Sequence, residues 1–399
     1  MKILQINAVY KFGSTGRTVF ELHNHFLNHG IDSYVAGPFF EKGNDKIIKI
    51  GNRLDWKFHA LFSRIFGLQG YYSKGATKRF IKKIKIINPD AIILRNIHAN
   101  YINLKILFNY LNNQNISTII NLDDCWYFTG KCVHYTLYEC CRWKTGCHNC
   151  PKLKMDNISW FFDRTRRMWN DKKELYSNNK KLGVIGVSNW IVAEATQSIL
   201  SKAKSIKCIY NWIDLNAFKP TPSEFRDEYG LVDKFVILCV ASSWSEKKGL
   251  SSIIDLSNNL DNNQIVVMVG DCKESLPKNI IHIPSTSSVD ELAKIYSSAD
   301  VFLQASREES FGKVAAEALS CGVPLITVDS TANKELVTKK TGILLEDLNL
   351  ENLKKAILEI QGKGKKFYSD ECMRFSREHF DYNKLTSELI DFISDLCNK

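Results

Sequence analysis

Two glutamates, Glu309 and Glu317, carry the clearest chemical signal in the sequence, with Phe311-Gly312 between them. If most of the span is helical, the carboxylates lie ~12 Å apart along the axis, at 1.5 Å per residue. The start of such a helix favours phosphate, and Gly312 allows close approach. A carboxylate at each end of a diphosphate-binding site suits a nucleotide sugar, which has a hydroxylated ring on either side of its diphosphate. The alternative is an amphipathic helix with two solvated glutamates.

The flanking residues predict a strand–loop–helix–strand unit. Residues 300–304 form an apolar, β-rich run, an Ala- and Leu-rich segment follows, and Cys321-Gly322-Val323-Pro324 ends it before the apolar run Leu325–Val328. Units of this kind build open parallel sheets.

These residues resemble the signature of retaining glycosyltransferases of family four. The matching pieces are Glu309-x7-Glu317 with Phe311-Gly312, Glu317-Ala318-Leu319 and Gly322-Val323-Pro324. The resemblance implies an α/β fold of two Rossmann-like domains facing each other across a cleft, the GT-B fold. It also implies transfer of a hexose from a nucleoside diphosphate sugar by front-face attack, without a protein nucleophile. No catalytic divalent metal is expected, and the sequence has no Asp-x-Asp to hold one.

A chain of 399 residues has room for two such domains. Residues 211–214 resemble the family's interdomain segment, with Trp212 in place of its glycine. We expect an acceptor-side domain at 1–210 with a cysteine-rich insertion at 125–151. A nucleotide-sugar-binding domain is expected at 211–378, and a C-terminal helix at 379–399 that crosses back to the first domain.

In the second domain, the resemblance assigns the charges that would hold the donor. Lys248 would neutralise the leaving phosphate, with Lys247 in reserve, although the family's preceding arginine is missing and an exposed lysine pair is the plainer interpretation. Glu309 would accept hydrogen bonds from the sugar and Glu317 from the ribose. The backbone N–H groups at Ser310, Phe311 and Gly312 would face the diphosphate.

In the first domain, a loop with Gly13, Gly16 and Arg17 is expected between the first strand and a helix starting near Thr18. Arg17 would touch phosphate or acceptor, or else be an ordinary surface arginine.

Two further candidates follow strands of the first domain. Asp123 stands where the family usually has histidine, so its role in acceptor binding or catalysis stays open, and it could also point away. His98, at a neighbouring strand end, could replace that histidine or be a structural, hydrogen-bonded one.

Five of the twelve cysteines crowd between Cys132 and Cys150, in a segment resembling an insertion from a branch of the family that makes bacterial surface polysaccharides. Cys147-x-x-Cys150 has zinc-knuckle spacing, and Cys132 with Cys140 or Cys141 would complete a structural zinc site. The alternatives are packed free thiols or a redox-labile pair, and His134 and His148 are other possible ligands.

The net charge of +11 is unevenly distributed. Residues 1–210 carry 32 Lys and Arg against 14 Asp and Glu, whereas residues 211–399 carry 22 against 29. An anionic membrane surface fits a basic half better than nucleic acid, for which no motif is present. Residues 78–87 place basic and apolar residues on opposing faces of a helix, as an interfacial helix does, but also as a helix with its apolar side in the core does.

No apolar run is long enough to span a membrane, and the apolar stretch at the N-terminus is too short for a signal peptide. We therefore expect a cytoplasmic enzyme, peripheral on the inner face of the cytoplasmic membrane. The implied acceptor is a saccharide, or one linked to undecaprenyl diphosphate. Two rivals remain: a phosphorylase-like enzyme on the same fold, and a sugar-nucleotide-binding subunit without activity.

Overall fold

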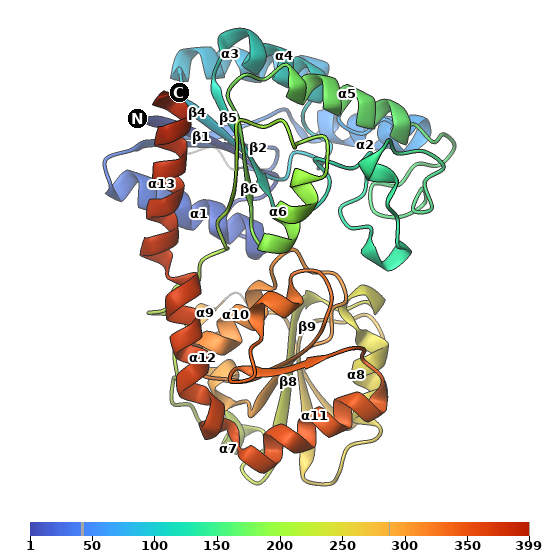
Figure 1. The fold of residues 1–399 in the computed structure, drawn as a ribbon, viewed down its shortest axis with the longest axis vertical. Helices are drawn as coiled ribbons and strands as arrows, with labels where there is room; N and C mark the ends of the chain where they lie inside the picture. Colours follow the sequence, from blue (N-terminus) through green and yellow to red (C-terminus); the bar gives the residue numbers. More distant parts are fainter. Residues whose placement is uncertain (41–43, 287, 399) are drawn as a thin grey trace. The chain divides into compact units, whose positions relative to one another are not determined.

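The computed structural model describes residues 1–40, 44–286 and 288–398. The chain divides into two compact units (Figure 1). One contains Met1–Ile209 together with the last stretch of the chain from Thr386, and the other contains Tyr210–Leu385.

The first unit is built on a parallel sheet of seven strands within the described residues, in the order β3-β2-β1-β4-β5-β6-β7. The strand order reverses between β1 and β4, and ligands of open α/β sheets bind beyond the carboxyl ends of the strands at such a point. The strands are β1 (Lys2–Ile6), β2 (Asp32–Gly37), β3 (Ile47–Lys49), β4 (Ala91–Leu94), β5 (Ser117–Leu122), β6 (Leu182–Gly186) and β7 (Ser205–Cys208).

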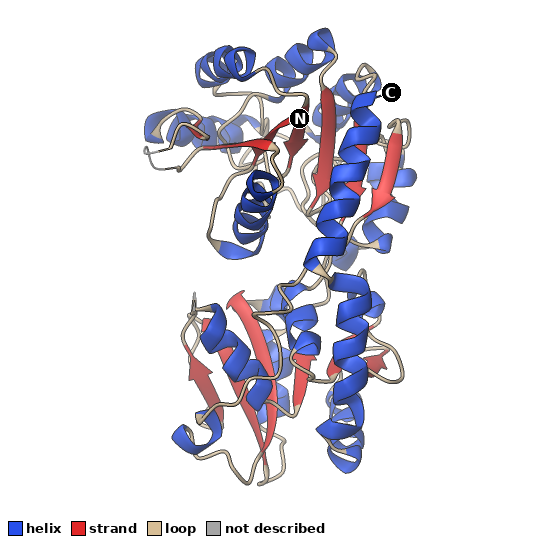
Figure 2. Cartoon of the chain, turned by 90° about the vertical axis from the view of Figure 1, so that its left-hand side faces the viewer, coloured by secondary structure: helices blue, strands red, loops and turns tan. Residues whose placement is uncertain are grey.

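Helices cover both faces of this sheet (Figures 1 and 2). Every residue of β4, β5 and β6 is buried, as expected for parallel strands covered on both sides. The helices are α1 (Gly13–Asn28), α2 (Arg53–Phe66), α3 (Lys74–Ile87), α4 (Leu104–Gln114), α5 (Thr165–Ser177), α6 (Asn189–Thr196) and, from Thr386, α13 (Tyr382–Asn398). Between β5 and α5 the chain is irregular, with the short 3₁₀ helices η1 (Thr136–Tyr138) and η2 (Arg142–Lys144).

The second unit repeats the architecture, with six described parallel strands in the order β10-β9-β8-β11-β12-β13. Here the order reverses between β8 and β11. The strands are β8 (Phe235–Ser243), β9 (Gln264–Asp271), β10 (Ile280–Ile283), β11 (Val301–Gln304), β12 (Leu325–Val328) and β13 (Gly342–Leu345).

The helices of the second unit connect these strands and cover the sheet (Figure 2). They are α7 (Phe225–Glu228), η3 (Glu246–Lys248), α8 (Leu250–Ser257), α9 (Val289–Ser298), α10 (Lys313–Ser320), η4 (Asn333–Leu336), α11 (Leu350–Lys363) and α12 (Lys365–Phe380). The predicted fold class, two parallel α/β domains of Rossmann type, is confirmed.

The C-terminal helix α13 belongs to the first unit from Thr386 onward. Its apolar face is buried, with Leu389, Phe392, Ile393 and Leu396 each less than a tenth exposed. Ser117 Oγ, on β5, donates to the Leu396 carbonyl at 3.4 Å. A Cβ added at Gly183, on β6, would come within 2.9 Å of Phe392 and Leu396, so the missing side chain makes room for the helix.

Helix α3 resolves the two interpretations of residues 78–87 in favour of the core. Phe80 and Ile84 are 2% and 0% exposed, and Ile87 is also buried. The lysines of α3 face outward, and Ile86 is its one large exposed hydrophobic side chain in the described structure. The prediction of an interfacial helix here is therefore wrong, because the apolar side is already used to pack α3 against the unit.

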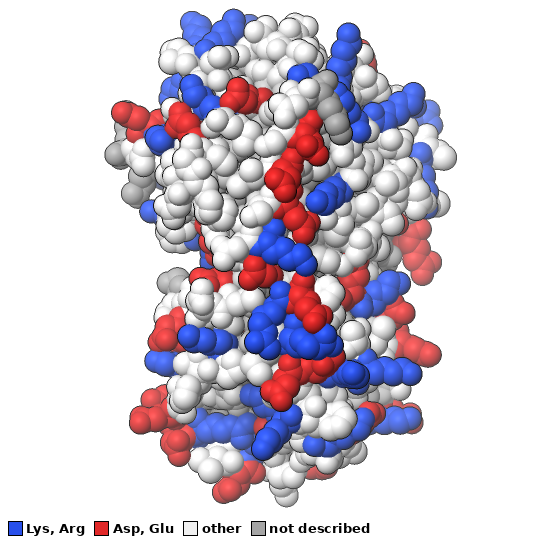
Figure 3. Space-filling model, turned by 60° about the vertical axis from the view of Figure 1, so that its left-hand side comes forward, with Lys and Arg blue, Asp and Glu red and all other residues white. Residues whose placement is uncertain are grey.

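Charged side chains of both signs are interspersed on the face shown in Figure 3. No helix in the part of the chain that the structure describes has the length and apolar character needed to cross a bilayer.

Candidate active site

A salt bridge between Lys248 and Glu309 lies at the strand-order reversal of the second unit. Lys248 follows β8 and Glu309 follows β11, and these strands are neighbours in the sheet. Lys248 Nζ lies 2.6 Å from Glu309 Oε1, and the side chains are 37% and 16% exposed. The two residues that the sequence assigned to the leaving phosphate and the sugar are thus brought together, at the carboxyl edge where a ligand is expected.

Close backbone packing holds the Lys248 turn against the loop after β11. Gly249 has φ = 77°, and a Cβ there would lie 2.4 Å from the Ala305 carbonyl oxygen. Only glycine combines that conformation with such an approach. The hydroxyl of Ser306 donates to the Lys247 carbonyl at 3.3 Å, which links the same two loops.

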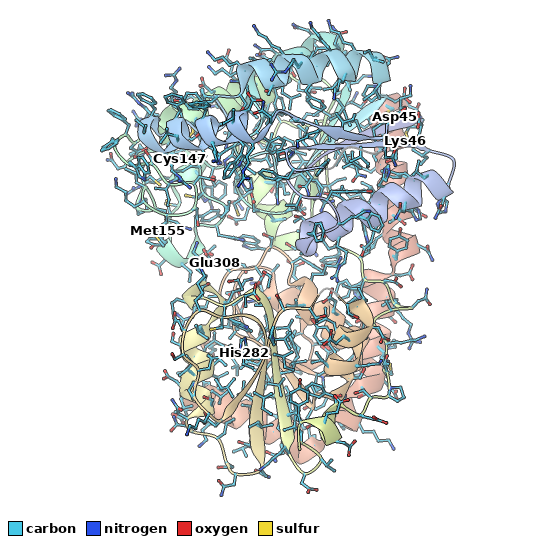
Figure 4. All side chains as sticks on the ribbon, turned by 180° about the vertical axis from the view of Figure 1, so that it is seen from behind. Asp45, Lys46, Cys147, Met155, His282 and Glu308 are labelled. Atoms are coloured by element: carbon cyan, nitrogen blue, oxygen red, sulfur yellow. The ribbon has the colours of Figure 1, made fainter. Side chains whose placement is uncertain are left out.

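The loop that carries Glu309 is fixed from two sides. Glu309 N–H donates to Thr331 Oγ1 at 3.0 Å, and Ala332 N–H donates to the Glu309 carbonyl at 3.2 Å. Gln304, the last residue of β11, donates from Nε2 to Glu309 Oε1 at 3.1 Å. Glu308, the preceding residue, is seen in this loop in Figure 4. The Glu309 carboxylate is therefore oriented by Lys248 and Gln304 together.

Residues Ser310 to Gly312 form the approach to α10, which begins at Lys313. Gly312 has φ = 91°, the left-handed region that favours glycine. The Phe311 ring is buried and contacts Tyr210 and Phe380, so only the backbone of Phe311 is free to serve a ligand. Ser310 is buried, whereas Lys247 is exposed.

The second glutamate of the pair, Glu317, lies on α10 and is only 2% exposed. The hydroxyl of Tyr296, on α9, donates to Glu317 Oε2 at 3.0 Å. The interpretation of Glu317 as a solvated helix residue is therefore wrong. Tyr296 was missed from the sequence, because a tyrosine on an apolar helix face is usually a core residue.

In the first unit, Asp123 is engaged by an arginine that the sequence did not single out. Arg95 donates from Nε to Asp123 Oδ2 at 2.9 Å and from Nη2 to Oδ1 at 2.6 Å, and both side chains are nearly fully buried. Burial raises the pKa of Asp123, and the charge of Arg95 opposes that effect. Among the interpretations left open for Asp123, the structure shows a carboxylate whose oxygens are occupied by a guanidinium.

His98 pairs with the neighbouring carboxylate. His98 Nε2 lies 2.8 Å from Asp124 Oδ2, and Trp126 N–H donates to Asp124 Oδ1 at 2.8 Å. Burial would raise the pKa of Asp124, but His98 and the Trp126 amide lower it overall. His98 keeps 17% of its side chain exposed. This pair lies at the carboxyl ends of β4 and β5, two strands that are adjacent in the sheet.

The predicted glycine loop after β1 is instead the first part of helix α1, which begins at Gly13. Gly13 has φ = 65°, and a Cβ at Gly16 would lie 3.2–3.3 Å from Val9 and the Tyr10 amide. Gly13 therefore supplies the left-handed conformation with which the helix starts, and Gly16 lets the first turn lie close to the preceding segment. Arg17 lies 3.8 Å from Glu21 one turn further on.

Several thiols of the cysteine-rich insertion interact with one another, Cys150 with Cys132 and Cys147, and Cys140 with Cys147. The Cys132 and Cys150 thiols share a hydrogen bond, which lowers the pKa of Cys150 to about 7 and raises that of Cys132. Cys147 Sγ accepts the Gly130 N–H at 3.1 Å, and burial raises the pKa of Cys147 to about 12. Across the described residues, no three His, Cys, Asp or Glu side chains form a metal-binding group.

The structural zinc site predicted from Cys132, Cys140, Cys147 and Cys150 therefore stays a prediction. Buried lysines also hold the insertion. Lys131 Nζ donates to the carbonyls of Lys152 and Leu153 at 2.9 and 2.8 Å, and Lys152 Nζ donates to the His134 carbonyl at 2.7 Å. These ammonium groups satisfy the carbonyls of an irregular segment, in which Cys147 and Met155 are seen in Figure 4.

The fold and the Lys248–Glu309 site define an α/β protein with two parallel sheets and a charged pair at the strand-order reversal of the second unit. Residues 222–371 match the family model "Glycosyl transferases group 1". The chain therefore carries a glycosyl transferases group 1 domain, of the family-four type and GT-B fold class.

Comparison with individual proteins extends the likeness to most of the chain. A colanic acid biosynthesis glycosyl transferase of Escherichia coli, WcaC, is 22% identical over 358 residues, which cover 86% of each protein. Among solved structures, sucrose-phosphate synthase from Thermosynechococcus elongatus superposes with a TM-score of 0.73 at 14% identity, covering 99% of this chain and 98% of the other. Anabaena HepE, solved in complex with UDP and glucose, gives 0.69 at 16% identity, covering 99% and 100%.

Proposed function

We propose that this protein transfers a hexose from a nucleoside diphosphate sugar to a saccharide acceptor with retention of configuration. The observation that carries the proposal is the Lys248–Glu309 pair at the β8/β11 reversal. A cation and a carboxylate side by side, followed by the start of α10, supply one group for a phosphate and one for sugar hydroxyls. The complex of Anabaena HepE with UDP and glucose supports this class of donor.

In the proposed reaction, the bond between the anomeric carbon and the diphosphate oxygen breaks as the acceptor hydroxyl bonds to the same face of the sugar. The hydroxyl proton passes to the departing phosphate oxygen. Lys248 and the amides of Ser310–Gly312 stabilise the negative charge that develops on the diphosphate. Lys247, which is exposed beside this turn, assists in holding the phosphates.

The two glutamates orient the donor in this proposal. Glu309, held by Lys248 and Gln304, accepts hydrogen bonds from the sugar hydroxyls. Glu317 accepts them from the ribose, with Tyr296 fixing its carboxylate. No catalytic divalent cation takes part, because the cationic side chain and amides carry the neutralisation.

On the acceptor side, the partly exposed His98 is the candidate to contact the acceptor, with Asp124 orienting its ring. Asp123 acts by positioning Arg95 rather than by touching substrate. Gly13, Gly16 and Arg17 line the start of α1 at the β1/β4 reversal and are candidates for further contacts.

We further propose a role in the synthesis of a bacterial surface polysaccharide, at the inner face of the cytoplasmic membrane. The likeness to WcaC, named for colanic acid biosynthesis, supports this pathway class. The acceptor is then a saccharide carried on undecaprenyl diphosphate or a related lipid.

The test is to incubate the purified protein with UDP-, GDP- and ADP-sugars and measure release of the nucleoside diphosphate, first alone and then with lipid-linked saccharide acceptors. The anomeric configuration of the product is read by NMR. Turnover of one donor with retention supports the proposal. A donor that raises the melting temperature but is neither transferred nor hydrolysed would replace it with a binding subunit, and turnover that requires orthophosphate would replace it with a phosphorylase-like activity.

A further inference from the structure

Helix α2 presents its apolar side outward. Leu54, Phe58, Leu61, Phe62 and Phe66 recur at helical spacing and are 63%, 57%, 41%, 37% and 42% exposed. A surface helix normally buries such a stripe. On α2 the inward positions are taken by the smaller or polar residues His59, Ala60 and Ser63. The outward stripe therefore has no partner within this chain's own core.

The stripe continues onto residues 158–162 through a row of ring contacts. Phe58, Phe62 and Phe66 stack along the helix with centroids 6.4 and 6.1 Å apart. Phe66 stacks on Phe162 at 6.4 Å and 8°, and Phe161 lies 6.4 Å from Phe162. The additional members Ile158, Trp160, Phe161 and Phe162 are 37–69% exposed. We call these nine residues the aromatic patch.

The segment carrying the second half of the aromatic patch is fixed to the end of α2. Trp160 N–H donates to the Arg64 carbonyl at 2.6 Å, and Ser159 Oγ donates to the Phe162 carbonyl at 2.6 Å. Gly67 ends α2 with φ = 65°, and a Cβ there would lie 2.2 Å from the Phe162 carbonyl oxygen. The segment that carries these rings is therefore fixed in position. Figure 1 shows α2 beside the irregular chain between β5 and α5.

Positive charge surrounds the aromatic patch. Arg53, Lys57 and Arg64 are exposed on α2, and Lys154, Arg164, Arg166 and Arg167 are exposed around residues 158–162. The guanidinium of Arg164 lies 5.3 Å from the Phe162 ring centre.

Two nearby carboxylates, Asp55 and Asp163, are engaged by other groups. Asp55 accepts from the Asn52 N–H and from Arg79, and Asp163 accepts from the amides of Cys150 and Thr165. The charge presented around the rings is therefore predominantly positive.

We propose that the aromatic patch is the surface by which this protein docks on an anionic lipid bilayer. Aromatic rings with a rim of lysine and arginine fit the boundary between acyl chains and acidic headgroups. A patch this contiguous is larger than the isolated apolar residues that ordinary surfaces carry. The proposal moves the membrane contact from α3, whose apolar side is buried, to α2 and residues 158–162. It specifies where the proposed polysaccharide enzyme meets the membrane, but it does not depend on which sugar is transferred.

The experiment is co-sedimentation of the full-length protein with vesicles of phosphatidylglycerol mixed with phosphatidylcholine, and with vesicles of phosphatidylcholine alone. A double variant, Phe58→Ser with Phe161→Ser, removes rings from both halves of the patch. We expect its partition onto the anionic vesicles to fall by about tenfold or more, since apolar burial drives interfacial binding. A second variant, Lys57→Glu with Arg64→Glu, should also lose most binding, and added salt should weaken the wild type.

The matched control is Ile86→Ser with Lys82→Glu on α3, which removes a hydrophobic side chain that is 84% exposed and a lysine. It should bind vesicles like the wild type. Release of nucleoside diphosphate without vesicles should be unchanged in all variants, so failure of docking and failure of the enzymatic proposal are separate results. Circular dichroism and the melting temperature verify that each variant is folded.

Three outcomes would overturn the proposal. The wild type fails to sediment with anionic vesicles, or the α3 control loses as much binding as the patch variants. Alternatively, light scattering shows a dimer without lipid that the Phe58→Ser/Phe161→Ser variant abolishes, which would assign the aromatic patch to a second copy of this chain.

Discussion

At the residue scale, the Lys248–Glu309 pair makes the sharpest prediction for activity. Glu309→Gln keeps the side-chain size but removes the charge that Lys248 and Gln304 orient, and we expect kcat/KM for donor turnover to fall by roughly 10²–10³. Lys248→Ala should lower kcat/KM by a similar factor. The double variant should lower kcat/KM by less than the product of the two single factors, because the two residues act as a unit. Steady-state release of nucleoside diphosphate measures all three.

The same variants should change stability little. The pair is partly solvated, with Lys248 37% exposed, and exposed ion pairs contribute about 0–1 kcal/mol. A melting temperature within a few degrees of the wild type is therefore expected, and a large drop would mean that the lost activity reflects unfolding. Lys247→Ala is the neighbouring control, and it should cost less activity than Lys248→Ala because Lys247 is exposed, whereas Lys248 Nζ lies 2.6 Å from Glu309.

For the Arg95–Asp123 pair, we predict an effect on the stability of the fold. Arg95→Met strands a buried carboxylate, and breaking a buried pair in this way costs about 3–5 kcal/mol. The double variant Arg95→Met/Asp123→Leu should recover most of the loss, since both charges are then gone. Urea unfolding followed by fluorescence measures the difference, and a stable single variant would show that Asp123 is solvated.

The sequence led to these pairs only in part. Glu309 and Lys248 were found because each lies in a short motif with a chemical meaning. Arg95 and Asp124 were missed as partners, because a pairing between two loops 28 or 26 residues apart depends on strand order. Strand order is set by packing over the whole sheet, which a local pattern does not contain.

At the scale of elements, Gly249 tests how the site is held together. Gly249→Ala places a Cβ 2.4 Å from the Ala305 carbonyl and forces a left-handed conformation on alanine. We expect the Lys248 turn to shift away from the loop of Glu309, so that KM for the donor rises and stability falls by roughly 1–3 kcal/mol. Gly230→Ala, with φ = 65° and open space around it, is the matched control for the conformational part alone.

Helix α2 is attached through a neutral histidine, which predicts a pH dependence. His59 Nε2 accepts the Gly70 N–H at 3.2 Å, so Nδ1 carries the proton and donates to Ser73 Oγ at 2.8 Å. Burial lowers the pKa of His59 from 6.5 to about 3. Between these values the unfolded chain binds a proton that the folded chain does not, so stability is lost as the pH falls below about 6.5, with a slope of up to about 1.4 kcal/mol per pH unit.

The measurement is urea unfolding at several pH values between 7.5 and 4.5. His59→Gln keeps an acceptor for the Gly70 amide without a titrating group. The free energy of unfolding of this variant should therefore depend less steeply on pH than that of the wild type, by the contribution of about one proton. Equal slopes in the two proteins would mean that His59 titrates in the folded state.

The elements themselves were mostly predictable, and the errors have a common cause. The strands around residues 91–94, 118–122 and 325–328 follow from short apolar runs between turn residues. The start of α1 was missed because Gly13 and Gly16 were interpreted as loop residues, although Gly13 begins the helix and Gly16 allows close packing. Residues 78–87 and α2 have similar amphipathic patterns, and which of them faces the core depends on tertiary packing.

At the scale of the whole molecule, the two sheets share one design. Both are parallel, both reverse their strand order next to their first strand, and both place charged side chains at the carboxyl ends of two adjacent strands. These strands are β4 and β5 in the first unit, and β8 and β11 in the second. The identity of those charges differs between the units. The first has carboxylates paired with Arg95 and His98, and the second has the glutamate and lysine of the proposed donor site.

The C-terminal helix carries the last prediction, because it completes the first unit although the second unit precedes it in the chain. A chain ending at Leu385 loses the buried Leu389, Phe392, Ile393 and Leu396. Each such side chain contributes about 1.5–3 kcal/mol when buried, so the truncation should destabilise the first unit by more than about 5 kcal/mol. The second unit keeps its own core and should remain folded.

Hydrogen exchange with mass spectrometry can separate these effects. Peptides from β5 and β6, which pack against α13 through Ser117 and Gly183, should lose protection in the truncated chain. Peptides from β8 and β11 should keep theirs, and a UDP-, GDP- or ADP-sugar that stabilises the full-length protein should still protect the loops after them. Loss of protection in both units together would show that they unfold as one, and would place the stability of the donor site under the control of α13.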